Sequence, residues 1–426
     1  MQKYIDKGRE KLHKILRWSE KYTKTDMVYV VENSFWSTVG QIFSLVLVLI
    51  SSIIFSRVIP KEIYGNYKFI ISATSILGSF TLSGMSAAII QAVAKGKDGV
   101  VKTAIYTSLR WGLITFISSL VLAGYYLYND NLSIALAIIV AGIANPLIST
   151  YGLYMSILTG KKDFRSITLY FSASQTLNTL LMITTAILIP NALALVLVGF
   201  SVNVLTYIFF YLITLDKYPL NNVDDPEMIK YGMHVSFMNA FSALANQIDK
   251  IFVFHYLGAA ELAIYSFAIA IPEQMRGSYK GLFNIALPKF SAKESELKKS
   301  LWDKTKKLTV LTVLIIALYV LFAPFIYKFL FPKYLDSIVY SQVYVIALIT
   351  VPGISLFSTY FSVRKETKIL YWISLITNST TIVLSYLLIK NYGLFGAVME
   401  NTISWTIMLA VNGLFFYKHK EINKIN

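Results

Sequence analysis

Long apolar runs recur along most of this chain, beginning at Asn33. Each is about 20 to 27 residues long, which is enough for a helix to cross a hydrocarbon layer about 30 Å thick. Because 56% of the 426 residues are hydrophobic and only 15% are charged, a water-soluble domain could not bury this much apolar surface. The sequence therefore predicts an all-α polytopic membrane protein. We place twelve spans at residues 33–56, 67–92, 104–127, 132–158, 166–189, 192–215, 231–256, 262–288, 308–330, 338–361, 369–389 and 394–417.

The distribution of basic residues predicts how the spans are oriented. Most of the 39 Lys and Arg residues lie before the first span, in every second connection, or after the last span. Cytoplasmic segments of membrane proteins carry this excess of positive charge, so both chain ends are predicted to be cytoplasmic. The net charge of +16 is then a consequence of topology. We expect the lipid bilayer, and not nucleic acid, to be the partner of these basic residues.

Two stretches of the sequence resemble each other at one constant spacing. Six residues match six others 198 positions later: Ile59, Pro60, Gly65, Tyr67, Phe69 and Ile71 match Leu257, Gly258, Ala263, Tyr265, Phe267 and Ile269. A shared spacing near half the chain length is what an internal duplication leaves behind. The alternative is chance similarity between apolar stretches.

The polar stretch at residues 216–230 separates the two copies and is interpreted as a linker. We predict an N-lobe of six spans at residues 28–222 and a C-lobe of six spans at residues 223–420. The first 27 residues are predicted to be a basic amphipathic segment on the cytoplasmic face, where it would meet anionic lipids. Residues 421–426 are predicted to be a cytoplasmic tail.

Several charged residues fall inside the predicted spans. A charge that faced lipid at mid-bilayer would cost about 2.5 to 3.5 kcal/mol, so these residues must face one another or a watery cavity. Glu273 and Arg276 are three residues apart on one helix face and can neutralise each other. Asp249 and Lys250 are adjacent and are expected to need partners on other helices, as structural ion pairs or as functional groups. If Lys250 instead bridges Asp249, the pair is structural and Glu400 is the better candidate for ion coupling. The seven residues are Arg110, Asp249, Lys250, Glu273, Arg276, Lys280 and Glu400.

The depth of these charges suggests two kinds of site. Arg110, Arg276 and Lys280 lie in the predicted cytoplasmic halves of their spans. They predict a cationic vestibule for an anionic headgroup, because the guanidinium fork matches phosphate oxygens. Asp249 and Glu400 lie in the outer halves and are candidates to bind a coupling ion, H⁺ or Na⁺. No other cofactor and no metal centre is expected.

Prolines interrupt three spans. Pro146 and Pro352 occupy the fourth and tenth spans, which hold the same position in the two predicted lobes, and Pro272 lies in the eighth. Paired interruptions of this kind point to a transport pathway, so the three prolines are candidate hinges. Ordinary helix bending is the alternative.

Several motifs occur together in an order that resembles a known family. They are NSFW in the first span, FSRVIPKEIYGNY, LSGMSAAIIQAVAKGK, QIDKIFVFHYLGAAELAIYSFA and ALPKFS. The chain resembles the polysaccharide biosynthesis flippases that export O-antigen and capsule repeat units. They belong to the multidrug, oligosaccharidyl-lipid and polysaccharide exporter (MOP) superfamily. Asp249 and Lys250 match the Asp-Lys pair of that family.

The resemblance implies two six-helix bundles with pseudo-twofold symmetry, as in the MATE exporters. It implies a transporter, not an enzyme, that moves an undecaprenyl-diphosphate-linked oligosaccharide from the inner to the outer leaflet of a prokaryotic cell membrane by alternating access. Polysaccharide polymerase and glycosyltransferases would then be partners.

Two other functions stay open. A drug or metabolite exporter of the same superfamily would be favoured by a cavity rich in carboxylates and aromatic rings. A membrane enzyme acting on polyprenyl-linked sugars is disfavoured, because the predicted outer connections are too short to form an extracytoplasmic domain.

The predicted topology can be tested with single cysteines, since the native chain contains none. Cysteines introduced at Ser291 and Asn129 should react with a membrane-impermeant maleimide from opposite sides of the membrane. Asn129 should react from the outside in intact cells. Reaction of both positions from one side would contradict the predicted orientation.

Overall fold

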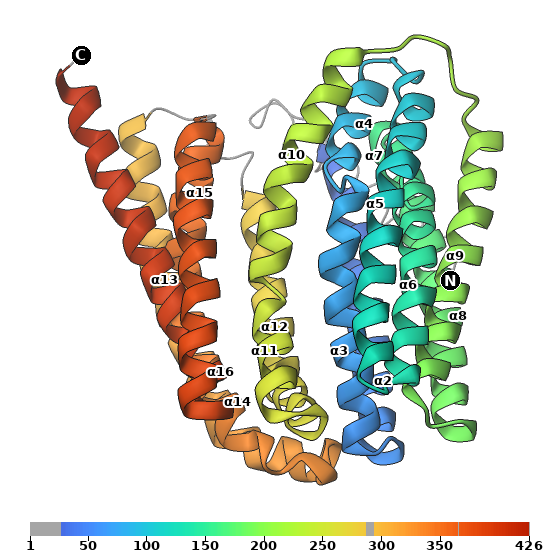
Figure 1. Ribbon diagram of the computed structural model, residues 1–426. Helices are drawn as coiled ribbons and strands as arrows, with labels where there is room; N and C mark the ends of the chain where they lie inside the picture. Colours follow the sequence, from blue (N-terminus) through green and yellow to red (C-terminus); the bar gives the residue numbers. More distant parts are fainter. Residues whose placement is uncertain (1–26, 287–293, 365, 426) are drawn as a thin grey trace, which may run out of the picture.

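The computed structural model describes the backbone of residues 27–286, 294–364 and 366–425. The predicted amphipathic segment at the N-terminus lies outside these ranges, apart from its last residue. We call residues 27–217 the first half. Its helices, coloured blue to green in Figure 1, are α2 (Met27–Val58), α3 (Lys61–Gly78), η1 (Ser79–Thr81), α4 (Met85–Ala94), α5 (Val100–Tyr128), α6 (Leu132–Tyr151), α7 (Tyr154–Gly160), α8 (Phe164–Leu188) and α9 (Ala192–Lys217).

The second half follows after the linker. Its helices are α10 (Pro226–Ala245), α11 (Ile248–Leu257), α12 (Ala259–Ala286), α13 (Glu294–Leu330), η3 (Pro332–Tyr334), α14 (Ser337–Ile346), η4 (Ala347–Thr350), α15 (Val351–Val363) and α16 (Thr367–Ile425). The backbone of Gly393 is not helical, with φ 58° and ψ −138°, so α16 consists of two helices that meet at this residue.

The described residues form an all-α polytopic membrane fold, as predicted. Seven of the described helices are long and apolar enough to cross a membrane, or eight if the pair α3–α4 counts as one span. This pair is bent by 47°. Leu82 adopts a left-handed conformation between its two parts, which the sequence pattern did not predict. The break at Gly393 separates the predicted eleventh and twelfth spans.

The helix bounds repeat at the spacing seen in the sequence. Helix α3 begins at Lys61 after Pro60, and α12 begins at Ala259 after Gly258. Proline has no N–H to lose at a helix start. Glycine allows the sharp turn from α11 into α12, where its φ is +93°. The two helices thus begin at equivalent positions of the repeat, although the backbone before them differs, with φ −58° at Pro60 and +93° at Gly258.

Helices α3 and α12 pack directly against each other. A Cβ atom added to Gly65 would lie 1.8 Å from the carbonyl oxygen of Ala259, so the two backbones approach too closely for any side chain there. The ring of Tyr64 lies 4.9 Å from that of Phe267. Both rings are buried.

Polar contacts from α2 and α3 to the region of η3 surround this crossing. Arg57 donates to the carbonyl oxygen of Phe329 at 2.8 Å, and Lys61 forms an ion pair with Asp336 at 3.0 Å. We call these contacts, together with the α3–α12 crossing, the seal. It joins the two halves at the end of the molecule that carries η3, at the bottom of Figure 1.

At the opposite end, the linker is bound to the first half. Lys97 forms an ion pair with Asp225 at 2.6 Å and holds the pKa of that carboxyl below its ordinary value. The N–H of Gly99 donates to the carbonyl oxygen of Val223. Helix α10 also packs against α4, where the N–H of Gly84 donates to Ser236 Oγ at 2.9 Å. Although α10 begins the second half, much of its surface therefore faces the first.

The seal predicts a clear difference between two glycine substitutions. Gly65→Ala should lower the melting temperature of the purified protein, because overpacking of this kind costs about 1 to 3 kcal/mol. Gly124→Ala is the matched control, since a Cβ atom at this exposed position of α5 would meet nothing within 4 Å. Equal melting temperatures for the two variants would contradict the close crossing of α3 and α12.

Candidate functional site

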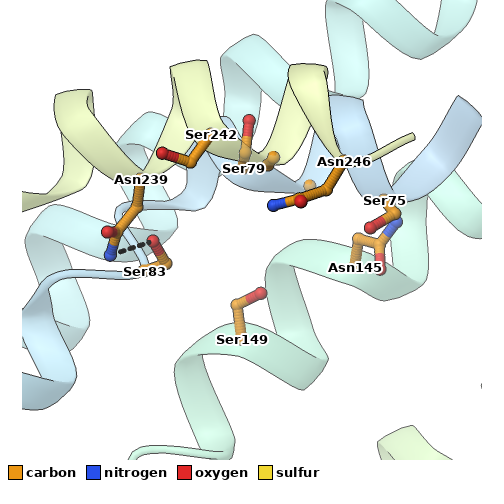
Figure 2. A pocket seen from close by; sticks show the side chains of 10 residues that line it. Ser75, Ser79, Ser83, Asn145, Ser149, Asn239, Ser242 and Asn246 are labelled. Atoms are coloured by element: carbon orange, nitrogen blue, oxygen red, sulfur yellow. Dashed lines mark hydrogen bonds between the residues drawn. The ribbon is translucent and has the colours of Figure 1, made fainter. Parts of the chain in front are cut away.

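A polar pocket of about 430 Å³ lies between the two halves (Figure 2). Its wall in the first half comes from α3, η1, the turn after η1, and α6. Its wall in the second half is one face of α10, on which lining residues recur at intervals of three or four, the spacing of one helix face. The lining residues are Ser75, Gly78, Ser79, Ser83, Asn145, Ser149, Asn239, Ser242, Ala243 and Asn246.

The pocket lining is polar but uncharged. Eight of these ten residues are Ser or Asn, and none of the ten carries a charge or an aromatic ring. Hydroxyl and amide groups can both donate and accept hydrogen bonds. Figure 2 shows Asn145, Ser149 and Asn246 around one shared space. Such a lining suits a ligand that is itself rich in hydroxyl groups.

Helix α10 connects the pocket to both halves. Asn239 donates to Ser83 Oγ at 3.2 Å, toward the first half. Ser242 accepts a hydrogen bond from Asn378 of α16 at 3.0 Å, toward the second half. A movement of one half relative to the other would therefore change the shape of this pocket.

Asp249 and Lys250 lie just beyond the pocket, at the start of α11. Lys250 Nζ lies 3.2 Å from Asp249 Oδ1 and 3.3 Å from the carbonyl oxygen of Asn246. The hydroxyl of Tyr265 donates to Asp249 Oδ2 at 2.7 Å and accepts from Asn401 Nδ2 at 3.1 Å. The expectation that the two adjacent charges need separate partners is wrong. The long Lys250 side chain folds back in the first turn of α11 and reaches its neighbour.

Glu400 is buried on α16, with only 1% of its surface exposed. Its Oε1 accepts a hydrogen bond from Ser404 at 2.6 Å. Among the ion pairs of the described residues, none includes Glu400. Its environment thus differs from that of Asp249, whose carboxylate has both a lysine and a tyrosine as partners.

Glu273 and Arg276 neutralise each other on α12. Arg276 Nη2 lies 2.8 Å from Glu273 Oε2, and the guanidinium lies 4.9 Å from the centre of the Trp405 ring. The hydroxyl of Tyr344 donates to Glu273 Oε1. The structure therefore has the local pairing that the sequence offered as an alternative to headgroup binding.

The other predicted headgroup residues are not brought to Arg276. Arg110 is exposed on α5, in helical register with the exposed apolar residues Tyr106, Leu113 and Ile117. The side chain of Lys280 lies outside the described residues. A shared vestibule of Arg110, Arg276 and Lys280 thus stays a prediction.

Two of the three candidate hinge prolines lie inside helices, and the third lies at the start of a helix. Pro146 is inside α6, and a Cβ atom on Gly112 of α5 would lie 2.6 Å from its ring. Pro272 is inside α12. Pro352 is in the first turn of α15, directly after η4. Their role as hinges stays a prediction.

Sequence reasoning missed the pocket itself. The signal was available, because Ser and Asn recur at intervals of three or four in residues 75–83, 145–149 and 239–246. The prediction of the site considers only charged residues. Uncharged polar residues are left out of it, because they are common in membrane helices as packing and hydrogen-bonding residues.

The fold and pocket together define a class: a polytopic α-helical membrane protein with a ligand-sized polar pocket between two halves. A family model described as "Polysaccharide biosynthesis protein" matches residues 30–274, which is more than half of the chain. The chain belongs to this family. No curated protein matches the sequence.

Solved structures of the MOP superfamily share this fold. The lipid II flippase MurJ in its inward closed conformation has a TM-score of 0.72 at 16% identity, covering 89% of this chain and 87% of MurJ. An outward-facing multidrug resistance MATE transporter has a TM-score of 0.66 at 18% identity, covering 93% and 96%. A MOP transporter from Pyrococcus furiosus has a TM-score of 0.65 at 17% identity, covering 92% and 95%.

Proposed function

We propose that this protein is a flippase for a lipid-linked glycan. Its substrate would be an undecaprenyl-diphosphate-linked oligosaccharide, a repeat unit of O-antigen, capsule or exopolysaccharide. The protein would move this unit from the inner to the outer leaflet of a prokaryotic cytoplasmic membrane by alternating access, with both chain ends in the cytoplasm. Family membership and the similarity in fold to a lipid II flippase support this proposal.

The uncharged pocket is the observation that carries the proposal. A sugar presents many hydroxyl groups and no charge, and the Ser and Asn side chains of the pocket can bond such groups as donors or acceptors. A bound apolar ligand would shield these groups from water and leave them unpaired, at a cost of about 1 to 3 kcal/mol each, so the lining favours a ligand that bonds to them.

The alternative is a cation-coupled exporter of drugs or metabolites. Structural similarity to MATE multidrug transporters favours it. A site for cationic, apolar drugs would be expected to contain carboxylates and aromatic rings. None of the ten residues that line the pocket has either. The glycan therefore fits this pocket better than a drug.

Transport can be measured in vesicles that contain the purified protein and a fluorescent undecaprenyl-diphosphate-linked oligosaccharide. The protein should speed the exchange of this lipid between leaflets, as read by its access to a reagent added outside. Asn145→Leu and Ser79→Leu should each slow the exchange about tenfold, because each removes a side chain that would hydrogen-bond to the sugar in the pocket.

Thr184→Leu is the matched control, because Thr184 is exposed on α8 and its hydroxyl bonds only within that helix. This variant should exchange the lipid as fast as the wild type. The drug-exporter alternative would be supported instead if the wild type left the lipid in place and expelled a cationic dye.

We further propose that Glu400 is the site of ion coupling, with H⁺ or Na⁺ as the driving ion. Asp249 is a weaker candidate, because Lys250 and Tyr265 already occupy its carboxylate. A buried carboxylate without a basic partner can instead be neutralised by a proton or a bound cation. Glu400 fits this description, because none of the ion pairs among the described residues includes it.

The coupling proposal predicts a difference between two variants. With a proton or sodium gradient imposed across the vesicle membrane, wild type and Asp249→Asn should exchange the lipid faster than without a gradient. Glu400→Gln should exchange it at one rate in both conditions. A gradient effect of normal size in Glu400→Gln would contradict the assignment.

A further inference from the structure

Two lysines from different halves lie on α3 and α11, which pack together on the side of the uncharged pocket that faces the seal. Lys68 is on α3, two helical turns before the pocket residue Ser75, and so lies roughly 10 Å from it along the axis on the same face. Lys250 contacts the backbone of the pocket residue Asn246. Helices α3 and α11 pack together here, since the rings of Phe69 and Phe254 stack 3.9 Å apart.

Lys68 has no carboxylate partner among the ion pairs of the described residues. Its side chain is half-buried, and its ammonium lies 5.4 Å from the centre of the Tyr64 ring. A cation over an aromatic face gains about 0.5 to 2 kcal/mol, which offsets only part of the cost of a charge inside the membrane. An anion bound beside Lys68 would remove the rest of this cost.

Lys250 can contact a second anion without losing its position. Its ammonium has three N–H donors, and its contacts with Asp249 and Asn246 at 3.2 and 3.3 Å are longer than the roughly 2.7 to 2.9 Å of a strong charge-assisted bond. Asp249 is held independently by Tyr265. Lys68, Lys250 and Asp249 together carry one net positive charge, and Glu400, which interacts electrostatically with Asp249 and Lys250, balances it only when ionised.

Arg276 offers less to a ligand, although it is the residue that the sequence singled out. Its guanidinium is neutralised by Glu273 and stacked on Trp405. An anion would have to displace Glu273, which also accepts a hydrogen bond from Tyr344.

We propose that Lys68 and Lys250 form an oxyanion-binding subsite at the end of the pocket that faces the seal. The subsite binds a phosphate or carboxylate group of the same ligand whose hydroxyl groups occupy the Ser and Asn pocket. This inference rests on the proposed function, since it assumes a glycan in the pocket. Asp249 is a positioning residue in this arrangement, because it holds Lys250 and does not touch the ligand.

Three short-chain probes distinguish the possible sources of the oxyanion. They are farnesyl-diphosphate-linked N-acetylglucosamine, farnesyl glucuronide, and the neutral farnesyl N-acetylglucosaminide. Their affinities for the purified full-length protein are measured by calorimetry. The wild type should bind at least one charged probe more tightly than the neutral one. The charged probe that is preferred identifies the oxyanion as the lipid diphosphate or as an acidic sugar.

Lys68→Met should weaken binding of the preferred charged probe about tenfold, the usual effect of losing a charged hydrogen bond, and should leave the neutral probe unchanged. Lys68→Arg should keep most of the preference. Lys250→Met alone would leave Asp249 without its counter-charge, so the double variant Lys250→Met with Asp249→Asn is used. It should lose the preference in the same way. Lys390→Met is the matched control, because Lys390 is exposed and bonded to Tyr386.

The proposal is overturned if the preference for a charged probe survives in both Lys68→Met and the double variant. It is also overturned if Arg276→Ala alone abolishes the preference, or if the neutral probe weakens as much as the charged one. If the wild type binds none of the three probes and does not move the labelled lipid in vesicles, the proposed function itself fails. Transport by a wild type that shows no preference for charge overturns the lysine subsite alone.

Discussion

The crossing of α3 and α12 is the contact on which the arrangement of the two halves depends. Gly65 and Ala259 allow the two backbones to touch, and the rings of Tyr64 and Phe267 pack beside them. These two helices contain the two stretches that match at a spacing of 198 residues. Farther along α3 lie Lys68 and the pocket residues Ser75 and Gly78. A change at this crossing would therefore be transmitted directly to the residues around the ligand site.

Most of the fold could be predicted from the sequence because hydrocarbon imposes a simple rule. A chain that crosses it must satisfy every backbone polar group internally, which leaves long helices as the solution for apolar runs of this length. The bend at Leu82 escaped this reasoning, because a left-handed residue in a broken span leaves no mark on hydropathy. The break at Gly393 could be predicted from the gap between two apolar runs.

The site was less predictable, and the reason lies in sequence distance. Glu273 and Arg276 pair within one helical turn, so the sequence could offer their pairing as an alternative. The chain from Asp249 through Tyr265 to Asn401 joins the consecutive helices α11 and α12 to α16, and Tyr265 and Asn401 are 136 residues apart in sequence. Helix packing decides which helices become neighbours, and this packing cannot be derived from a single sequence. The Ser and Asn lining of the pocket has the same origin, because its walls belong to α3, α6 and α10.

The uncharged pocket lining also matters for the step of a transport cycle in which the carrier returns without substrate. A carrier must return empty, and any charge in its binding pocket would then lose contact with water as the walls come together. Hydroxyl and amide groups avoid this penalty, because they can bond to one another across the closing space, as Asn239 and Ser83 already do. In the proposed alternating-access cycle, an uncharged lining would lower the barrier to the unloaded return, the step that resets the protein for its next substrate.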